Sequence, residues 1–383
     1  MGILHKLLQI QPRRELKEFY LFSVFFSFAN ALILIFEPVF FYKEGISLST
    51  IALYYALHYT LYVWLLPLGG KFASRFGLER SLSVAMPLFV VYFVALATIP
   101  FVPNVFWVSW ILLAVFKIFY WPAAHAEISK FGEKKNMGTE LSWMYAITKG
   151  VGVLGPLVGG FIAAIYGFSV LFVLAAGMAL LATFPLLRTK ERYQVKKFTY
   201  GSVWAVICSK THRRMRWMMM GWGENLIDTV YWPIFMFIIL GGTTKLGLVA
   251  SANALIMTVM AFFIGEISDR FSRRQVMRVH LPFLILSHLF KPLAGGSVRL
   301  MLTDTFSKMS FIGVRLPMWY KLYSQGRSVG PLKYAVAFEM ILAMAKAATA
   351  WILVVVFMMT LPYTGFVIAF VMAAVMAVMY AAL

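Results

Sequence analysis

Apolar stretches of about 20 residues, separated by short polar breaks, follow one another along the whole chain. Each stretch has about the length that an α-helix needs to cross the hydrocarbon core of a bilayer. Turn-forming residues such as Gly295-Gly296-Ser297 mark the breaks. The pattern predicts twelve membrane-spanning helices, at 18–41, 48–70, 81–100, 104–126, 141–165, 168–187, 217–240, 247–266, 276–294, 299–319, 334–358 and 364–383.

Residues that bend helices or let backbones approach recur along the chain at a single offset of 195 positions. The pairs are Asn30 and Asn225, Pro38 and Pro233, Gly70 and Gly265, Arg75 and Arg270, Pro87 and Pro282, and Pro122 and Pro317. These residue types set the shape of a helical bundle, so the second half is predicted to copy the first. We therefore expect an all-α integral membrane protein with two pseudo-symmetric six-helix bundles, at 1–187 and 217–383, joined by a cytoplasmic loop at 188–216. Duplicated membrane bundles are typical of transporters.

Composition supports the membrane assignment and excludes a water-soluble protein. The chain is 61% hydrophobic and 13% charged, with a mean hydropathy of +0.80. Its net charge of +20 is unevenly placed, with 26 lysines and arginines on one side of the predicted bundle and three on the other. This is the positive-inside pattern, which predicts a multi-pass plasma-membrane protein with both termini in the cytoplasm. The basic charge therefore reports topology, and we expect no nucleic-acid partner.

The residues that usually hold cofactors are scarce. One cysteine, Cys208, excludes a disulfide or a cysteine-ligated metal within a single chain. The six histidines show no ligand spacing, and no phosphate-binding loop is present to drive transport with ATP. We expect no metal, no cofactor and no enzymatic activity.

The 188–216 loop combines basic residues with the amphipathic positions Phe198, Val203, Trp204 and Ile207. This pattern predicts a basic helix that lies at the lipid surface. A lipid or partner sensor is the alternative interpretation of the same segment.

Two loops carry related polar motifs. The loop after the second span reads Gly70-Lys-Phe-Ala-Ser-Arg75-Phe-Gly77, and the loop after the eighth reads Gly265-Glu-Ile-Ser-Asp269-Arg270-Phe-Ser-Arg273-Arg274. Both resemble the G-x-x-x-D-R-x-G-R-R signature of the major facilitator superfamily, although Ser74 replaces the aspartate and Ser272 the second glycine. The resemblance implies the major facilitator fold, and it implies that these loops lock the cytoplasmic side of the outward-facing state, here through Asp269. Simple anchoring of the loops at the headgroups is the alternative.

A third motif lies in the fifth span, which reads Gly155-Pro156-Leu-Val-Gly159-Gly160. It resembles the signature of the proton-coupled antiporter branch of the superfamily, which exports drugs and other solutes. The alternative interpretation is that these small residues let two helices pack closely.

Carboxylates within the spans are candidates for proton coupling, because an ionisable group at membrane depth normally faces a cavity or a partner. Glu224 and Asp228 share one helix face. Two carboxylates cannot both ionise cheaply in a dry site, which predicts that one of them binds a proton. In the alternative interpretation they line a water-filled vestibule and both ionise as ordinary carboxylates. Asp304 and Lys308 form either a self-neutralising pair one turn apart or a pair that opens for substrate.

The remaining candidates also lie within predicted spans. Lys117 and Lys149 are expected to face an anionic part of the substrate, and Glu339 shares a helix face with Lys346. Further cavity or gate candidates are Glu37, Asn30 and Asn225. Lys291 and Arg315 are assigned to the headgroup region, and His125 and Glu127 are expected to be solvated. The family resemblance implies that spans 3, 6, 9 and 12 support the cavity and that the other eight line it.

These observations predict a secondary transporter that moves a small organic or amphipathic solute by alternating access, with proton-coupled export as the sharper hypothesis. A lipid or lysolipid flippase or an uncoupled uniporter is one alternative, and a transport-dead sensor or scaffold is another. The expected partners are a small-molecule substrate, protons and the lipid bilayer, and the protein is expected to be monomeric.

Overall fold

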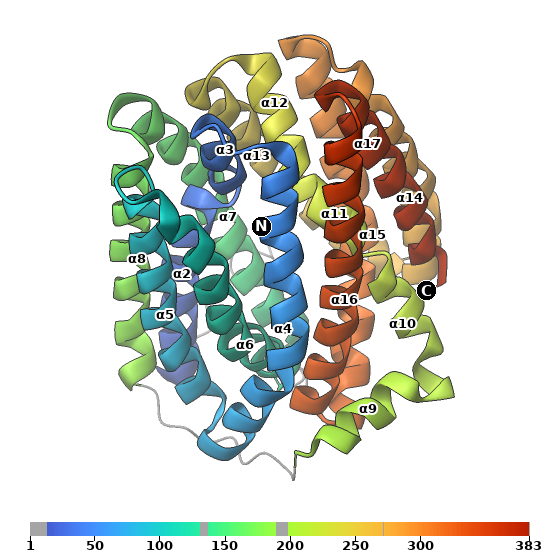
Figure 1. Ribbon diagram of the computed structural model, residues 1–383. Coiled ribbons are helices and arrows are strands. Elements are labelled where there is room, and N and C mark those ends of the chain that lie inside the picture. Colours follow the sequence, from blue (N-terminus) through green and yellow to red (C-terminus); the bar gives the residue numbers. More distant parts are fainter. Residues whose placement is uncertain (1–13, 131–136, 189–197, 271, 383) are drawn as a thin grey trace, which may run out of the picture.

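The computed structural model of the protein describes residues 14–130, 137–188, 198–270 and 272–382. The side chains of residues 14–17, 19, 130, 137–149, 188, 262 and 265–270 lie outside this description. The architecture is helical throughout the described residues, with the blue-to-green first half and the yellow-to-red second half side by side (Figure 1).

Seven helices account for the six spans predicted in the first half. They are α2 (Arg14–Ile33), α3 (Phe36–Lys43), α4 (Leu48–Phe76), α5 (Leu78–Thr98), α6 (Phe106–Lys130), α7 (Met137–Ile165) and α8 (Phe168–Arg188). Helices α2 and α3 together fill the first predicted span. The break between them falls where Pro38 cannot donate a backbone hydrogen bond to the carbonyl one turn earlier.

The second half opens with a short helix outside the spans and repeats the broken first span. Its helices are α9 (Tyr200–Cys208), α10 (Arg213–Met220), α11 (Gly223–Leu226), α12 (Trp232–Leu240), α13 (Thr243–Arg270), α14 (Arg273–Phe290), α15 (Ser297–Val329), α16 (Pro331–Met359) and α17 (Pro362–Val378). Between α11 and α12 the segment η4 (Ile227–Tyr231) is a π-helical turn that carries Asp228. Such turns are frequent at functional sites, and here Pro233 removes a regular helical bond just beyond it.

Nine helices among the described residues are long and apolar enough to cross a membrane. The predicted spans at 141–165, 276–294 and 299–319 correspond to α7, α14 and α15, which fall outside this set. The described apolar part of α7 is the shorter stretch Gly150–Ile165. Helix α14 is less apolar because it carries Arg273, Arg274 and Arg278. Helix α15 is less apolar because it carries Asp304, Lys308 and Arg315 of the site described below.

The two halves meet mainly along two helix pairs, with smaller contacts of α6 with α15 and α16 and of α3 with α12. Helix α4 packs against α16, and α7 packs against α13. At the α7–α13 contact the Thr243 hydroxyl donates to the Gly160 carbonyl at 3.2 Å. A Cβ atom on Gly247 would lie 2.3 Å from the Pro156 carbonyl oxygen, so glycine is required for this approach. Small residues of α7 and α13 therefore bring the backbones of the two halves into contact.

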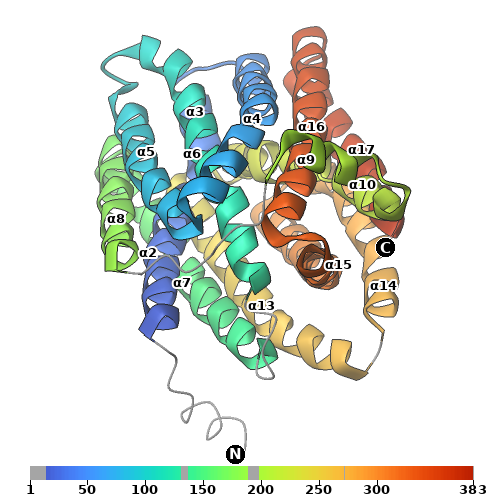
Figure 2. The same ribbon diagram turned by 90° about the horizontal axis from the view of Figure 1, so that it is seen from below.

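The predicted amphipathic helix of the central loop is present as α9. Thr199 caps it by accepting from the Ser202 backbone N–H at 3.2 Å. Val203 and Ile207 are buried whereas Trp204 is exposed, so the helix has one apolar face toward the protein. It lies across the end of the bundle, against α16 (Figures 1 and 2).

Candidate functional site

A buried ion pair joins α11 to α15 inside the second half. Glu224 is fully buried, and its Oε2 accepts from Arg315 Nη2 at 2.6 Å and from the Tyr380 hydroxyl at 2.9 Å. The Arg315 guanidinium lies over the Trp222 ring, 3.7 Å from its centroid. The pairing and the aromatic contact together compensate for taking the guanidinium out of water.

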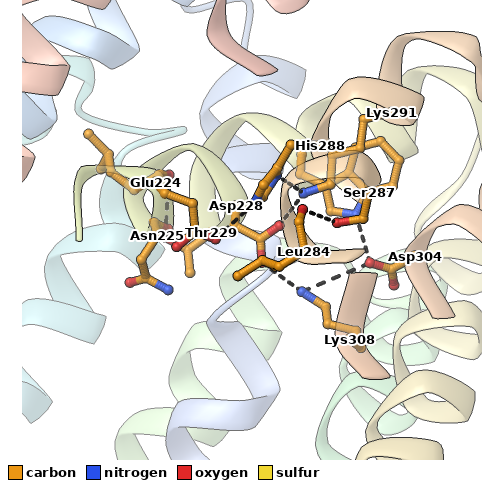
Figure 3. Close-up of polar contacts among 12 residues, drawn as sticks. Glu224, Asn225, Asp228, Thr229, Leu284, Ser287, His288, Lys291, Asp304 and Lys308 are labelled. Atoms are coloured by element: carbon orange, nitrogen blue, oxygen red, sulfur yellow. Dashed lines mark hydrogen bonds and ion pairs between the residues drawn. The ribbon is translucent and has the colours of Figure 1, made fainter. Parts of the chain in front are cut away.

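A second cluster surrounds Asp228 on the π-helical turn. Lys308 of α15 donates to its Oδ2 at 2.9 Å, and Lys291, which follows α14, donates to its Oδ1 (Figure 3). Lys291 Nζ also lies 3.1 Å from His288 Nδ1, and His288 Nε2 lies 3.1 Å from Glu224 Oε1. Lysine can only donate, so Nδ1 accepts and Nε2 carries the hydrogen, although its geometry toward Glu224 Oε1 is not that of a hydrogen bond. The histidine thus links the two carboxylates into one network.

The third carboxylate of this network is Asp304 in α15. It accepts from Trp232 Nε1 at 2.8 Å and from Asn253 Nδ2 at 2.6 Å, and it lies 3.9 Å from Lys308 (Figure 3). Asp304 and Lys308 thus form the predicted intrahelical pair, but Lys308 lies closer to Asp228, so the pair is part of a larger network. We call Glu224, Asp228 and Asp304 with Arg315, Lys291 and Lys308 the carboxylate network, in which three acidic groups face three basic ones.

Two members of the network were expected at the headgroups, and this expectation is wrong. Lys291 is fully buried and Arg315 is 2% exposed. Helix α15 continues to Val329, so Arg315 lies about 20 Å from that end of the helix. Lys291 comes directly after α14, and its side chain reaches back to Asp228 on η4. Side chains at a helix end lean toward the helix amino terminus, which here leads toward the interior.

Glu224, Asp228 and His288 place one ligand atom each within 4.8 Å of one another, the arrangement of a possible metal site. Both oxygens of Asp228 already accept from Lys291 and Lys308, and Glu224 Oε2 accepts from Arg315, whereas Glu224 Oε1 faces His288 without a hydrogen-bond partner among the described residues. A divalent cation would have to displace these charges, so the donor set fits protein cations better than a metal.

A different polar cluster connects the two halves. His125 of α6 lies with Nε2 3.0 Å from Glu339 Oε1 of α16 and with Nδ1 2.9 Å from the Tyr323 hydroxyl. Tyr62 of α4 donates to Glu339 Oε2 at 3.0 Å. His125 is 3% exposed and Glu127 is 7% exposed, so the prediction that both are solvated is wrong. Glu339 belongs to the second half of the chain, whereas its partners His125 and Tyr62 belong to the first.

Lys346, seven residues after Glu339 on α16, lies near a different residue of α4. Its Nζ is 3.4 Å from the Tyr59 hydroxyl, and Lys117 Nζ is 3.1 Å from His58 Nε2. Glu37 of α3 is half-buried and accepts from the Tyr55 hydroxyl at 2.8 Å. These contacts lie along α4, where it faces α3, α6 and α16.

The other predicted site residues are distributed more widely. Asn30 and Asn225 are half-buried, and the Asn225 carbonyl accepts from the Thr229 hydroxyl at 2.8 Å. For the predicted site residues Lys149, Gly265, Asp269 and Arg270 the structure describes only the helical backbone.

The described residues of the two loop motifs lie at the ends of helices. Gly77 has φ of +107° between α4 and α5, a conformation that favours glycine, and Arg75 is exposed beside it. Arg273 lies over the Tyr320 ring, 3.3 Å from its centroid, and Arg274 is exposed.

Two further residues of these loops are explained by packing and capping. Ser272 caps α14 together with Gln275, a role that glycine at this motif position would not fill. A Cβ atom on Gly70 would lie 2.6 Å from Phe198 Cζ, so Gly70 allows the segment before α9 to cover this end of α4.

The glycines of the fifth-span motif lie at two close helix approaches. A Cβ atom on Gly155 would lie 2.4 Å from Ala31 Cβ in α2, and one on Gly159 would lie 2.6 Å from the Leu32 carbonyl oxygen. A Cβ atom on Gly160 would lie 2.6 Å from the Thr243 carbonyl oxygen in α13. One face of the motif thus packs within the first half and another meets the second half.

The fold and these buried charges define an all-helical membrane protein with a polar interior. The sequence profile of the Major Facilitator Superfamily matches residues 19–315, and the chain belongs to this family of transporters, which are not enzymes. Among solved structures, the chain is similar to a variant of the E. coli fucose:proton symporter FucP. The match has a TM-score of 0.65 and 14% identity, and it covers 96% of this chain and 98% of that one. A search of curated proteins finds no match.

These comparisons confirm the predicted fold class and the resemblance to the superfamily, whereas the antiporter branch is not confirmed. Sequence reasoning missed the roles of His125, His288, Lys291 and Arg315. A signal was available for His288 and Lys291, because both lie within the predicted ninth span at 276–294, which was expected only to support the cavity.

Proposed function

We propose that this secondary transporter is coupled to protons, that it exports a small organic or amphipathic solute, and that Glu339 is its coupling carboxylate. The observation that carries the proposal is the buried contact between His125 of α6 and Glu339 of α16, at 3.0 Å. It spans the two halves, which in alternating access rock against each other around a central site.

The chemistry follows from separating the halves. When α6 and α16 move apart, Glu339 loses its imidazole partner and the hydrogen bond from Tyr62. A buried carboxylate without such partners is costly, so binding a proton becomes favourable in that state. When the halves close again, neutral His125 donates from Nε2 and Tyr62 donates from its hydroxyl to the carboxylate, and these donors favour its ionised form, so the proton is released from Glu339. Proton occupancy at this pair therefore differs between the two conformations, which is what coupling requires.

The carboxylate network has a different role in this proposal. Each of its acidic groups already has a basic or hydrogen-bonding partner inside the second half, and these partners move together with it. Glu224, Asp228 and Asp304 are therefore proposed to hold α11, η4, α14 and α15 together. This replaces the hypothesis that mutual repulsion of Glu224 and Asp228 creates the proton site.

Export is proposed from the fifth-span motif. The motif resembles the antiporter signature, and its Gly160 meets α13 where the two halves touch, a position at which it can affect their movement.

The moving units are proposed to be 1–187 and 217–383, linked by 188–216, with both termini in the cytoplasm and the protein in the plasma membrane as a monomer. Asp269 is proposed to stabilise the closed cytoplasmic side.

The test uses purified protein in liposomes of defined internal pH. A panel of small organic solutes is screened by thermal stabilisation, and the flux of each ligand found is measured with and without a pH gradient. Wild-type protein should accumulate solute against its gradient when protons flow the other way. Glu339→Gln should abolish this accumulation and retain solute counterflow, whereas Glu44→Gln in an exposed loop should behave as wild type.

Three other outcomes would contradict the proposal in whole or in part. Flux that is indifferent to the pH gradient would support an uncoupled uniporter or, for lipid probes, a flippase. Gradient-driven accumulation that survives in Glu339→Gln would remove this residue from the coupling step. Ligand binding without any flux would favour the sensor or scaffold alternative, which the replacement of aspartate by Ser74 also suggests.

A further inference from the structure

Two lysines from different halves of the chain lie around one aromatic ring. Lys117 of α6 and Lys346 of α16 place their Nζ atoms 4.9 and 5.2 Å from the centroid of the Tyr59 ring in α4. Lys346 is 8% exposed, and Lys117 is half-buried. In the part of the chain that the structure describes, no carboxylate lies within ion-pairing distance of either ammonium group. This contrasts with the lysines of the carboxylate network.

The groups that do contact these lysines are neutral. His58 is fully buried, and its Nδ1 lies 3.2 Å from the Trp110 carbonyl oxygen, to which it must donate. Its Nε2 is then free to accept from Lys117 at 3.1 Å, which fixes a neutral imidazole. Lys346 donates to the Tyr59 hydroxyl at 3.4 Å. An ammonium group has three donors, so both lysines keep hydrogen-bonding capacity for a further partner.

A buried cation without an anion is unfavourable, and the contacts with one aromatic ring compensate only in part. We infer that Lys117 and Lys346 bind the negatively charged group of the transported solute, a carboxylate or a phosphate ester carried on an apolar body. The inference rests on the proposed transport function and names its substrate class. The rings of Tyr59 and Tyr62, on one face of α4, are buried and pack on His58, so they can contact the apolar body only when the halves move apart.

The position of the pair ties substrate binding to the movement of the halves. One lysine belongs to each half, so an anion that contacts both holds α6 and α16 together. Lys346 also lies two turns from Glu339 on the same helix. An anion bound at Lys346 and a proton bound at Glu339 would therefore act on the same moving element. This assignment pairs Lys117 with Lys346 and not with Lys149.

The experiment measures thermal stabilisation of the purified full-length protein by four compounds that share one apolar body. They are 4-phenylbutyrate, 4-phenylbutyl phosphate, 4-phenylbutanol and 4-phenylbutylamine. At least one anion should bind, and the alcohol and the amine should bind at least tenfold more weakly. Lys117→Gln and Lys346→Gln should each weaken anion binding at least tenfold and leave binding of the alcohol unchanged. Lys245→Gln, at an exposed position near the start of α13, is the matched control.

The two anions distinguish a carboxylate substrate from a phosphate ester. Equal binding of the alcohol and the anions, no binding of either anion, or unchanged anion binding in both lysine variants would overturn the inference. Its failure is separable from that of the proposed function. Anion binding that depends on both lysines, with flux indifferent to pH, would retain the inference and overturn proton coupling. Gradient-driven export of an uncharged solute, without anion binding, would retain proton coupling and overturn the inference.

Discussion

Arg315 donates from Nη2 to Glu224 Oε2 at 2.6 Å, and neither side chain is more than 2% exposed. The bond joins the broken helix of the seventh span to α15, so it fixes the element that carries Asp228. Removing one partner would leave a charge buried without compensation, whereas removing both would leave no charge behind.

Glu224→Gln is therefore expected to destabilise the protein by about 3–5 kcal/mol, and Arg315→Met by a similar amount. The double variant should lose less than the sum of the single losses, because neither uncompensated charge remains. Thermal and denaturant unfolding of the protein in detergent measures these differences. Glu44→Gln is the surface control, with an expected change within about 0.5 kcal/mol. A loss below about 1 kcal/mol in both single variants would show that the pair contributes little.

Gly160→Ala should disturb the contact between the halves, because its new Cβ would lie 2.6 Å from the backbone carbonyl oxygen of Thr243. Backbone cannot move aside as a side chain can, so α7 and α13 must separate. Spin labels at Ser47 and Gly242 should report a longer distance in this variant. Gly177→Ala is the matched control in α8, since no heavy atom lies within 4 Å of that added Cβ. An unchanged distance distribution in Gly160→Ala would argue against glycine packing as the basis of this contact.

Membrane topology is predicted from the asymmetry of basic residues. In a Cys208→Ser background, single cysteines at Ser47 and Gly242 should react with an impermeant reagent added outside intact cells. Cysteines at Ser74 and Ser272 should react only after the membrane is opened. Labelling of either loop serine position from outside would reverse the assignment of both termini to the cytoplasm.

The cytoplasmic loops lead to a prediction about conformational populations. Asp269→Asn should shift the protein toward the inward-open state and reduce transport, because Ser74 leaves the first loop without an equivalent carboxylate. Ser74→Asp should restore part of the outward-facing population. A carboxylate that contacts the amino terminus of another helix contributes about 0.3–1 kcal/mol when exposed, which corresponds to a change of up to several-fold in a two-state ratio. Distances between labels on cytoplasmic loops measure the shift, and identical distributions in wild type and Asp269→Asn would exclude this role.

Much of the fold could be predicted because the bilayer restricts what a chain can do. Long apolar stretches must become helices there, and Pro38 and Pro233 mark the breaks because proline removes a backbone donor wherever it occurs. The loop motifs of Gly70 and Arg273 were sufficient to indicate the superfamily, which the profile match confirms.

Which charges face one another was decided only by tertiary structure. Asp304 and Lys308 are one turn apart in sequence, yet Lys308 lies closer to Asp228, because the packing of η4 against α15 brings a second carboxylate nearer. His125 and Glu339 are 214 residues apart, and only the contact between the halves brings them within 3.0 Å. Periodicity along one helix reports which residues share a face. The identity of the facing partner depends on rotation and depth of separate helices, which no local pattern contains.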